Sequence, residues 1–115
     1  MNTLLANQSA VTVVFFDANG IFQKQVTVGA MPDMICFNNN FTKVLTANEG
    51  EPNSTYSLDP EGSVSIIDIS SGIPTLSQAN VITLPLTAYN GQETALRAQG
   101  IRIFSSSASV AQDLE

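Results

Sequence analysis

The chain has 115 residues, of which 43% are hydrophobic and 12% are charged, and its formal net charge is −6. This composition excludes a disordered chain, and the four cationic side chains are too few for the basic surface that nucleic acids or anionic membranes attract. The absence of histidine excludes a Ser-His-Asp triad, and the single cysteine excludes an intramolecular disulfide.

The first elements predicted along the chain form a hairpin. Val11–Phe16 reads VTVVFF, a run typical of a strand that is covered on both faces. Asp17–Gly20 is a turn, because Asp can accept a hydrogen bond from the backbone two residues on and Gly tolerates a positive φ. Ile21–Val28 alternates apolar and polar residues, which predicts an edge or half-exposed strand.

Two short strands and a turn are predicted next. Gly29–Asp33 is a connection, and Met34–Phe37 is expected to be a buried strand that holds Cys36 as an inert thiol. Asn38–Asn40 forms a turn, since Asn accepts the left-handed region more readily than most residues. Lys43–Ala47 returns as a strand.

The second half of the chain begins with a long loop at Asn48–Gly62, which is rich in Pro, Gly and acids. Ser63–Ile69 and Ala79–Leu84 are predicted strands, and the first of them has apolar residues on both faces. Asn90–Gly100 is the one predicted helix, with Asn90 as its cap, Glu93 in capping-box position and Gly100 as its stop. Ile101–Phe104 reads as a brief strand-like run.

A short repeat links the two halves. Val13–Asp17 and Val64–Asp68 share the pattern V-x-φ-φ-D, in which φ is apolar, with the aspartates 51 residues apart (17 to 68). A repeat of about 50 residues built from four short antiparallel strands is a signature of propeller blades. The repeat therefore predicts an all-β chain of the β-propeller class.

Several segments resemble the choice-of-anchor I propeller proteins. Residues 28–34 (VGAMPDM) resemble the family signature VGALPDM, residues 47–52 match ANEGEP, and residues 59–68 match DPEGSVSIID. Residues 96–104 (LRAQGIRIF) and 108–115 resemble LRAKGVRIF and ASVAQDLE. The resemblance implies a YVTN-like propeller that is secreted or on the cell surface, as in relatives of a mesenchyme-specific cell surface glycoprotein. Some bacterial members carry alkaline phosphatase or phytase-like regions.

The repeat and the resemblance together divide the chain. Residues 11–28 are expected to end one blade, 32–84 to form one complete blade, 85–107 to be an insertion with the short helix near 90–99, and 108–115 to begin the next blade. The chain is thus predicted to be a propeller fragment whose partners are the remaining blades of a larger parent. Made alone, it would expose apolar strand faces, and we expect it to aggregate or to depend on a partner.

Two sets of acids are candidate sites. Glu49, Glu51, Asp59 and Glu61 in the long loop offer the hard oxygen ligands that Ca²⁺ selects, although their spacing is not that of an EF-hand, and the alternative is a solvated acidic loop. Acids at the starts of inner strands would face the propeller channel and bind a cation or polar ligand, or else cap turns; they are Asp33, Asp113 and Glu115. Asp17 and Asp68 are predicted to form turns.

Two functions follow from these features. The first is a non-catalytic binding or structural module of a secreted, cell-surface or periplasmic parent, with an unknown polar ligand or protein as partner and no nucleic acid. The second is part of an alkaline phosphatase or phytase-like metallohydrolase whose acidic loop holds Ca²⁺. No catalytic residue is assigned.

No apolar run approaches the roughly 20 residues that span a bilayer, so membrane insertion is not expected. Residues 1–10 do not read as a signal peptide, so any export signal would lie outside the chain.

Overall fold

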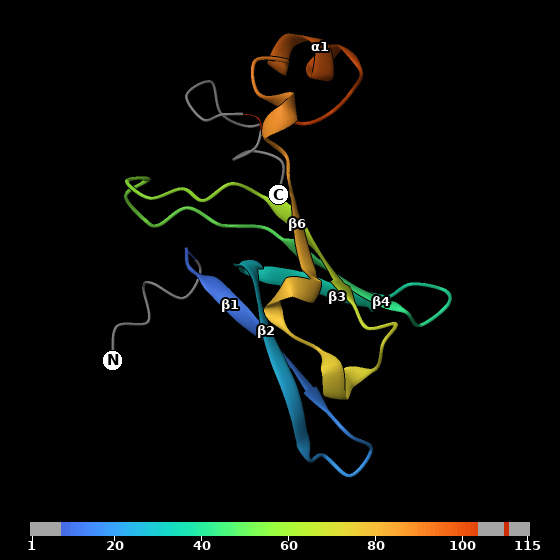
Figure 1. Cartoon of the computed structure of the whole chain (residues 1–115). Coiled ribbons are helices and arrows are strands. Elements are labelled where there is room, and N and C mark those ends of the chain that lie inside the picture. Colours follow the sequence, from blue (N-terminus) through green and yellow to red (C-terminus); the bar gives the residue numbers. More distant parts are fainter. Residues whose placement is uncertain (1–7, 104–109, 111–115) are drawn as a thin grey trace.

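The structure is a computed structural model and describes residues 8–103 and residue 110 (Figure 1). Strands make up most of the regular structure in these residues, and the α-helix is short. The strands and helices in chain order are β1 (Ala10–Phe16), β2 (Phe22–Ala30), β3 (Pro32–Phe37), β4 (Lys43–Asn48), β5 (Ser63–Asp68), β6 (Val81–Pro85) and α1 (Glu93–Ala98), with single 3₁₀ turns at Ile73–Thr75, Gln78–Asn80 and Thr87–Tyr89.

The described strands form two antiparallel sheets. β1 and β2 pair as a hairpin, and β3, β4, β5 and β6 form a four-stranded sheet in sequence order. The predicted all-β fold with one short helix is therefore confirmed, and the four-stranded meander is consistent with a propeller blade. α1 lies beyond the end of β6, away from both sheets (Figure 1). The predicted blade boundaries stay predictions.

The two copies of the repeat end in the same kind of turn. Asp17 Oδ1 accepts hydrogen bonds from the backbone N–H groups of Asn19 and Ile21, both at 2.9 Å. Asp68 Oδ1 accepts one from the N–H of Ser70 at 2.9 Å. Both aspartates form turns, as predicted. Each carboxylate accepts a hydrogen bond from a backbone N–H that lies just beyond the end of its strand.

The hairpin packs one face against the four-stranded sheet, and this contact forms the main core. Its buried residues are Val13, Val26 and Val28 from the hairpin, Val44 and Ile67 from the four-stranded sheet, and Leu76 from the connection between β5 and β6. Burying one such side chain contributes about 1.5–3 kcal/mol. Sheet-on-sheet packing is therefore what holds the two halves of the repeat together.

Two predictions of burial are wrong. β1 was expected to be covered on both faces, but Val14 and Phe16 on its other face are exposed. β3 was expected to be buried, yet Met34 is 62% exposed and Cys36 is also exposed. The reason is that Met34 and Cys36 lie on the side of the four-stranded sheet opposite to the hairpin, and no described element covers that side.

The predicted connection at Gly29–Asp33 is also wrong, because β2 continues to Ala30 and β3 begins at Pro32. Met31 alone joins the two strands, with φ at 46°. This one-residue link keeps the end of β2 close to the start of β3.

The predicted helix forms, but it is shorter than expected. α1 begins after Gln92 rather than at Asn90, and Glu93 accepts a hydrogen bond from the N–H of Gly91 at 3.0 Å. The helix ends at Ala98 with Gln99 as its C-cap. Gly100 follows as the predicted stop, with φ at 84° and its N–H donating to the Arg97 carbonyl at 3.0 Å. Residues 101–103 are not a strand, contrary to the prediction, and Phe104 lies outside the described residues.

Candidate docking face

A buried polar network lies on the side of the four-stranded sheet that faces the hairpin. Asn48 at the end of β4 is 3% exposed, and its amide nitrogen donates to Ser63 Oγ at 3.0 Å and to Ser65 Oγ at 2.9 Å. Its amide oxygen accepts the Thr46 hydroxyl at 2.9 Å. The amide nitrogen and the amide oxygen of Asn48 are therefore both hydrogen-bonded, as buried polar groups need to be. These bonds hold the side chain in one orientation.

Gly29 in β2 lies directly over this network. A Cβ built on Gly29 would come within 2.6 Å of Asn48 Nδ2 and within 2.8 Å of its Cβ. The Gly29 N–H also faces Ser65 Oγ at 3.4 Å. Because Gly29 has no side chain, the buried Asn48 fits against it. This contact explains the glycine in β2 and the asparagine at the end of β4.

We call the side of the four-stranded sheet that contacts the hairpin the near face, and the opposite side the far face. Residues that pair across antiparallel strands share a face, and neighbours along a strand alternate between faces. Val44, Thr46, Ser65 and Ile67 lie on the near face. The pairing places two rows of four apolar residues on the far face, namely Cys36, Leu45, Ile66 and Ile82 in the first row and Met34, Ala47, Val64 and Leu84 in the second.

The far face is open to solvent in the part of the chain that the structure describes. Ile82 is 61% exposed and Leu84 is 47% exposed, while Leu45 and Ile66 on the central strands are half-buried by their neighbours. An exposed apolar surface that crosses four strands is typical of an interaction site rather than of ordinary surface. The far face is the candidate site of this chain.

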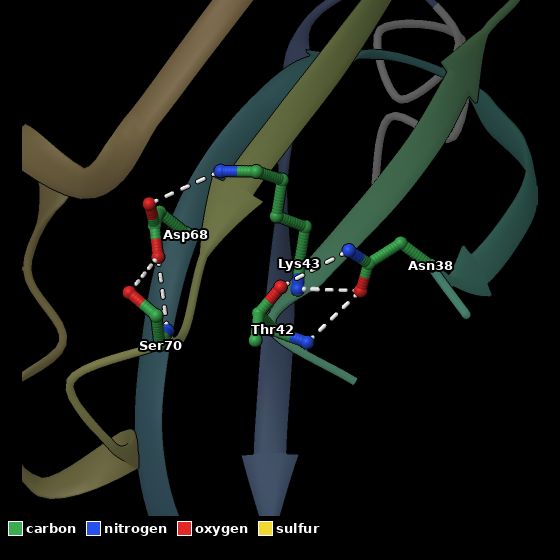
Figure 2. A network of polar contacts seen from close by, with 5 residues as sticks. All are labelled: Asn38, Thr42, Lys43, Asp68 and Ser70. Carbon is green, nitrogen blue, oxygen red and sulfur yellow. Dashed lines mark hydrogen bonds and ion pairs between the residues drawn. The ribbon is translucent and has the colours of Figure 1, made fainter. Parts of the chain in front are cut away.

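An ion pair borders the far face at the end nearest the β3–β4 turn (Figure 2). Lys43 Nζ lies 3.1 Å from Asp68 Oδ2, and the two residues pair across β4 and β5 on the same side as Leu45 and Ile66. Both side chains are nearly half exposed. The two charges offset each other, so the pair adds no net charge beside the apolar rows.

The turn that leads into Lys43 is held by one side chain. Asn38 Oδ1 accepts the backbone N–H groups of Thr42 and Lys43, both at 2.9 Å, and Asn38 Nδ2 donates to Thr42 Oγ1 at 3.0 Å (Figure 2). The predicted Asn turn is therefore confirmed. By fixing the start of β4, it also fixes where Lys43 meets Asp68.

The carboxyl of Asp68 is acidic for an aspartate. The Ser70 hydroxyl, the Ser70 N–H and Lys43, in that order, lower the pKa of Asp68 from its ordinary value of 3.8 to about 2. The hydroxyl donates to Oδ1 at 2.6 Å, which favours the ionised form. Since the folded pKa is below the unfolded one, Asp68 stabilises the fold above pH 3.8, and this contribution is lost as pH falls toward 2.

We expect an NMR titration of the Asp68 carboxyl carbon to give a pKa of about 2. Ser70→Ala should raise this pKa toward 3.8 by more than Lys43→Met does, because the hydroxyl is the largest cause of the shift. Asp68→Asn should remove the part of the fall in the free energy of unfolding between pH 3.8 and 2 that comes from Asp68. An equal or larger effect of Lys43→Met would contradict this order of causes.

The acids singled out in the sequence do not gather into one group in the described structure. Glu49, Glu51 and Asp59 are half-buried in the loop between β4 and β5, whereas Glu61 is exposed there. Asp33 is exposed on the edge strand β3, and Asp113 and Glu115 lie outside the described residues. Among the described residues, no three or more acidic or cysteine side chains lie together so as to hold a metal ion. The calcium site stays a prediction.

Sequence reasoning predicted that the chain made alone would expose apolar strand faces, but it did not identify the residues of the far face, although a signal for them was present. The repeat V-x-φ-φ-D contains Val64 and Ile66, two members of the far face, at the positions that Val13 and Phe15 occupy in the first copy. It also missed the contact between Gly29 and Asn48, because nothing in a single sequence pairs a glycine with an asparagine 19 residues away (29 to 48).

A comparison with protein-family models gives a match that covers nearly the whole chain. A family model described as the choice-of-anchor I domain matches residues 5–115. Neither the curated proteins nor the solved structures give a match. None of the helices in the described ranges is long and apolar enough to cross a membrane.

Proposed function

The chain belongs to the choice-of-anchor I family, and from this premise we propose that it is a non-catalytic structural and binding module of a secreted or cell-surface protein. Family membership itself indicates a surface or anchor-related module. The finer proposal is that the module works by stacking β-sheets, with the remaining blades of a larger propeller as its partners.

The observation that carries this proposal is the distribution of apolar residues over the two faces of the four-stranded sheet. The near face is covered by the hairpin, with Val44 and Ile67 in the core. The far face has two further apolar rows, and no described element covers them. A sheet with two apolar faces is built to lie between two layers, which is the arrangement in stacked blades.

The division expected from the sequence fits this proposal. Residues 11–28, which contain β1 and most of β2, would be the outer strands of one blade, and residues 32–84 with β3 to β6 would be the next. Residues 85–107 would be an insertion between blades, and 108–115 would open the following one. Each blade then has its own apolar faces and depends on its neighbours for cover.

An activity assay and a surface assay test the proposal. We expect the full-length protein to hydrolyse no p-nitrophenyl phosphate or phytate above a buffer control, with or without Ca²⁺. We expect an epitope tag on it to be accessible to antibody on intact cells or to be found in the medium.

A four-site variant serves as the matched control for the acidic loop, with Glu49, Glu51, Asp59 and Glu61 each changed to Ala. On the present proposal it behaves like the wild type in both assays. Ca²⁺-dependent turnover that disappears in this variant would contradict the proposal and favour a metallohydrolase.

A further inference from the structure

The loop between β4 and β5 contains a turn that repeats the Asn38 turn. Asn53 Oδ1 accepts the backbone N–H groups of Ser57 and Leu58 at 3.0 and 3.4 Å, as Asn38 Oδ1 accepts the two equivalent N–H groups. Asn53 Nδ2 donates to Ser57 Oγ at 2.9 Å, as Asn38 Nδ2 donates to Thr42 Oγ1. The two turns therefore share one design, in which an asparagine side chain holds the backbone that follows it.

Both turns place an aromatic residue where the backbone is left-handed. Phe41 has φ of 55° and Tyr56 has φ of 54°. In the hairpin turn the residue at the same distance after Asp17 is Gly20, with φ of 77°, and its N–H likewise donates to the carbonyl of the first residue. The left-handed region destabilises a residue that has a Cβ but not glycine. A bulky side chain there therefore has a role other than setting the path of the backbone.

The two aromatic rings differ in what they contact. Phe41 packs against Phe37, with ring centroids 5.9 Å apart, so its ring has a partner within the fold. Tyr56 takes part in none of the ring contacts among the described residues, and its hydroxyl makes no hydrogen bond with them. The Tyr56 residue is 76% exposed. Nothing in the described fold explains a tyrosine at this position.

Tyr56 belongs to the ordered tip of a projecting loop. The loop extends beyond the end of the four-stranded sheet (Figure 1). Its tip is closed by two backbone hydrogen bonds of 2.9 Å, from the Asn53 N–H to the Leu58 carbonyl and from the Tyr56 N–H to the Asn53 carbonyl. Exposed hydroxyl residues flank the tyrosine, namely Ser54, Thr55 and Ser57. Tyr among Ser and Asn is the composition of antibody binding loops, in which the rigid ring supplies contact area and the polar groups adapt.

We infer that Tyr56 is the anchor by which this loop binds a separate protein, with the ring in an apolar pocket of that protein and the hydroxyl on a hydrogen-bond acceptor within it. A projecting ring does not enclose a small molecule, so the partner supplies the pocket. Residues 48–62 carry four acids and no base, which disfavours an acidic partner surface or a second copy of this chain with its net charge of −6. The inference goes beyond the proposed function, because its partner is not a blade of the same propeller.

Photocrosslinking from position 56 tests the inference. The 115-residue chain with Tyr56→p-benzoylphenylalanine is irradiated together with the proteins of the source cells and their medium. We expect one protein to be crosslinked, and excess wild-type chain but not excess Tyr56→Gly chain to prevent this. With that protein purified, Tyr56→Gly should raise the Kd about 30-fold or more, as loss of a hot-spot residue does. Ser71→Gly, in an exposed turn elsewhere, is the matched control and should leave the Kd unchanged.

Tyr56→Gly is also expected to unfold at the same urea concentration as the wild type or at a higher one, because glycine fits the left-handed backbone. A lower unfolding midpoint would show that the ring supports the fold and would overturn the inference. A crosslinked dimer of the chain, a crosslink to lipid or polysaccharide alone, or the lack of any crosslink that the wild-type chain displaces would overturn it too. Phosphatase turnover by the parent protein would refute the non-catalytic function and leave this inference standing.

Discussion

Gly29→Ala is expected to lower the free energy of unfolding by about 2 kcal/mol, because it adds a methyl group where the well-packed Asn48 side chain already lies. The added Cβ would sit 2.6 Å from Asn48 Nδ2, and the amide cannot rotate away without breaking its bonds to Ser63 and Ser65. Leaving those buried groups unpaired has its own penalty of about 1–3 kcal/mol. Urea unfolding followed by circular dichroism measures the change.

The matched control removes the clash from the other side. In an Asn48→Gly background the side-chain atoms that the new Cβ would meet are gone, so Gly29→Ala should then change the free energy of unfolding by about 0.5 kcal/mol or less. Asn48→Gly alone is itself destabilising, which is why the comparison is made within that background. An equal effect of Gly29→Ala in both backgrounds would show that its cost does not come from Asn48.

The local elements of this fold could be predicted from the sequence because they depend on neighbours in the chain. The turn at Asp17 follows from a carboxylate that reaches the N–H of Asn19, and the end of α1 follows from a glycine at positive φ. Each of these is decided within a few residues. The strands of the four-stranded sheet lie in their order in the chain, as a blade of four antiparallel strands predicts.

Burial could not be predicted in the same way, because it depends on which sheet lies over which face. Met34 and Cys36 read as core from their apolar neighbours, yet they lie on the face of β3 that is turned away from the hairpin. Ile67 and Ile66 are identical and adjacent in the sequence, but Ile67 faces the hairpin and Ile66 faces away from it. Composition marks both sides of β5 as apolar, and only the packing of the sheets tells them apart.

That adjacent pair gives the second large prediction. Ile67→Ala should lower the free energy of unfolding of the 115-residue chain by about 3 kcal/mol, because Ile67 is 0% exposed and its removal leaves a cavity between the sheets. Ile66→Ala makes the same chemical change on the half-buried far face and should cost about 1 kcal/mol, mostly from lost burial. Both substitutions replace isoleucine by alanine in the same strand. The difference between their effects on the free energy of unfolding therefore reflects how fully each face of the sheet is covered.

The same pair measured in the parent polypeptide, which on the present proposal contains the remaining blades, separates a covered far face from an open one. If another sheet docks there, Ile66 becomes a core residue like Ile67, and Ile66→Ala should then cost about 3 kcal/mol as well. The cost of Ile67→Ala should stay nearly unchanged, because the hairpin covers it in both polypeptides. A small Ile66→Ala effect in both would mean that the far face stays open to water, and the apolar rows across β3 to β6 would then need another explanation than a stacked sheet.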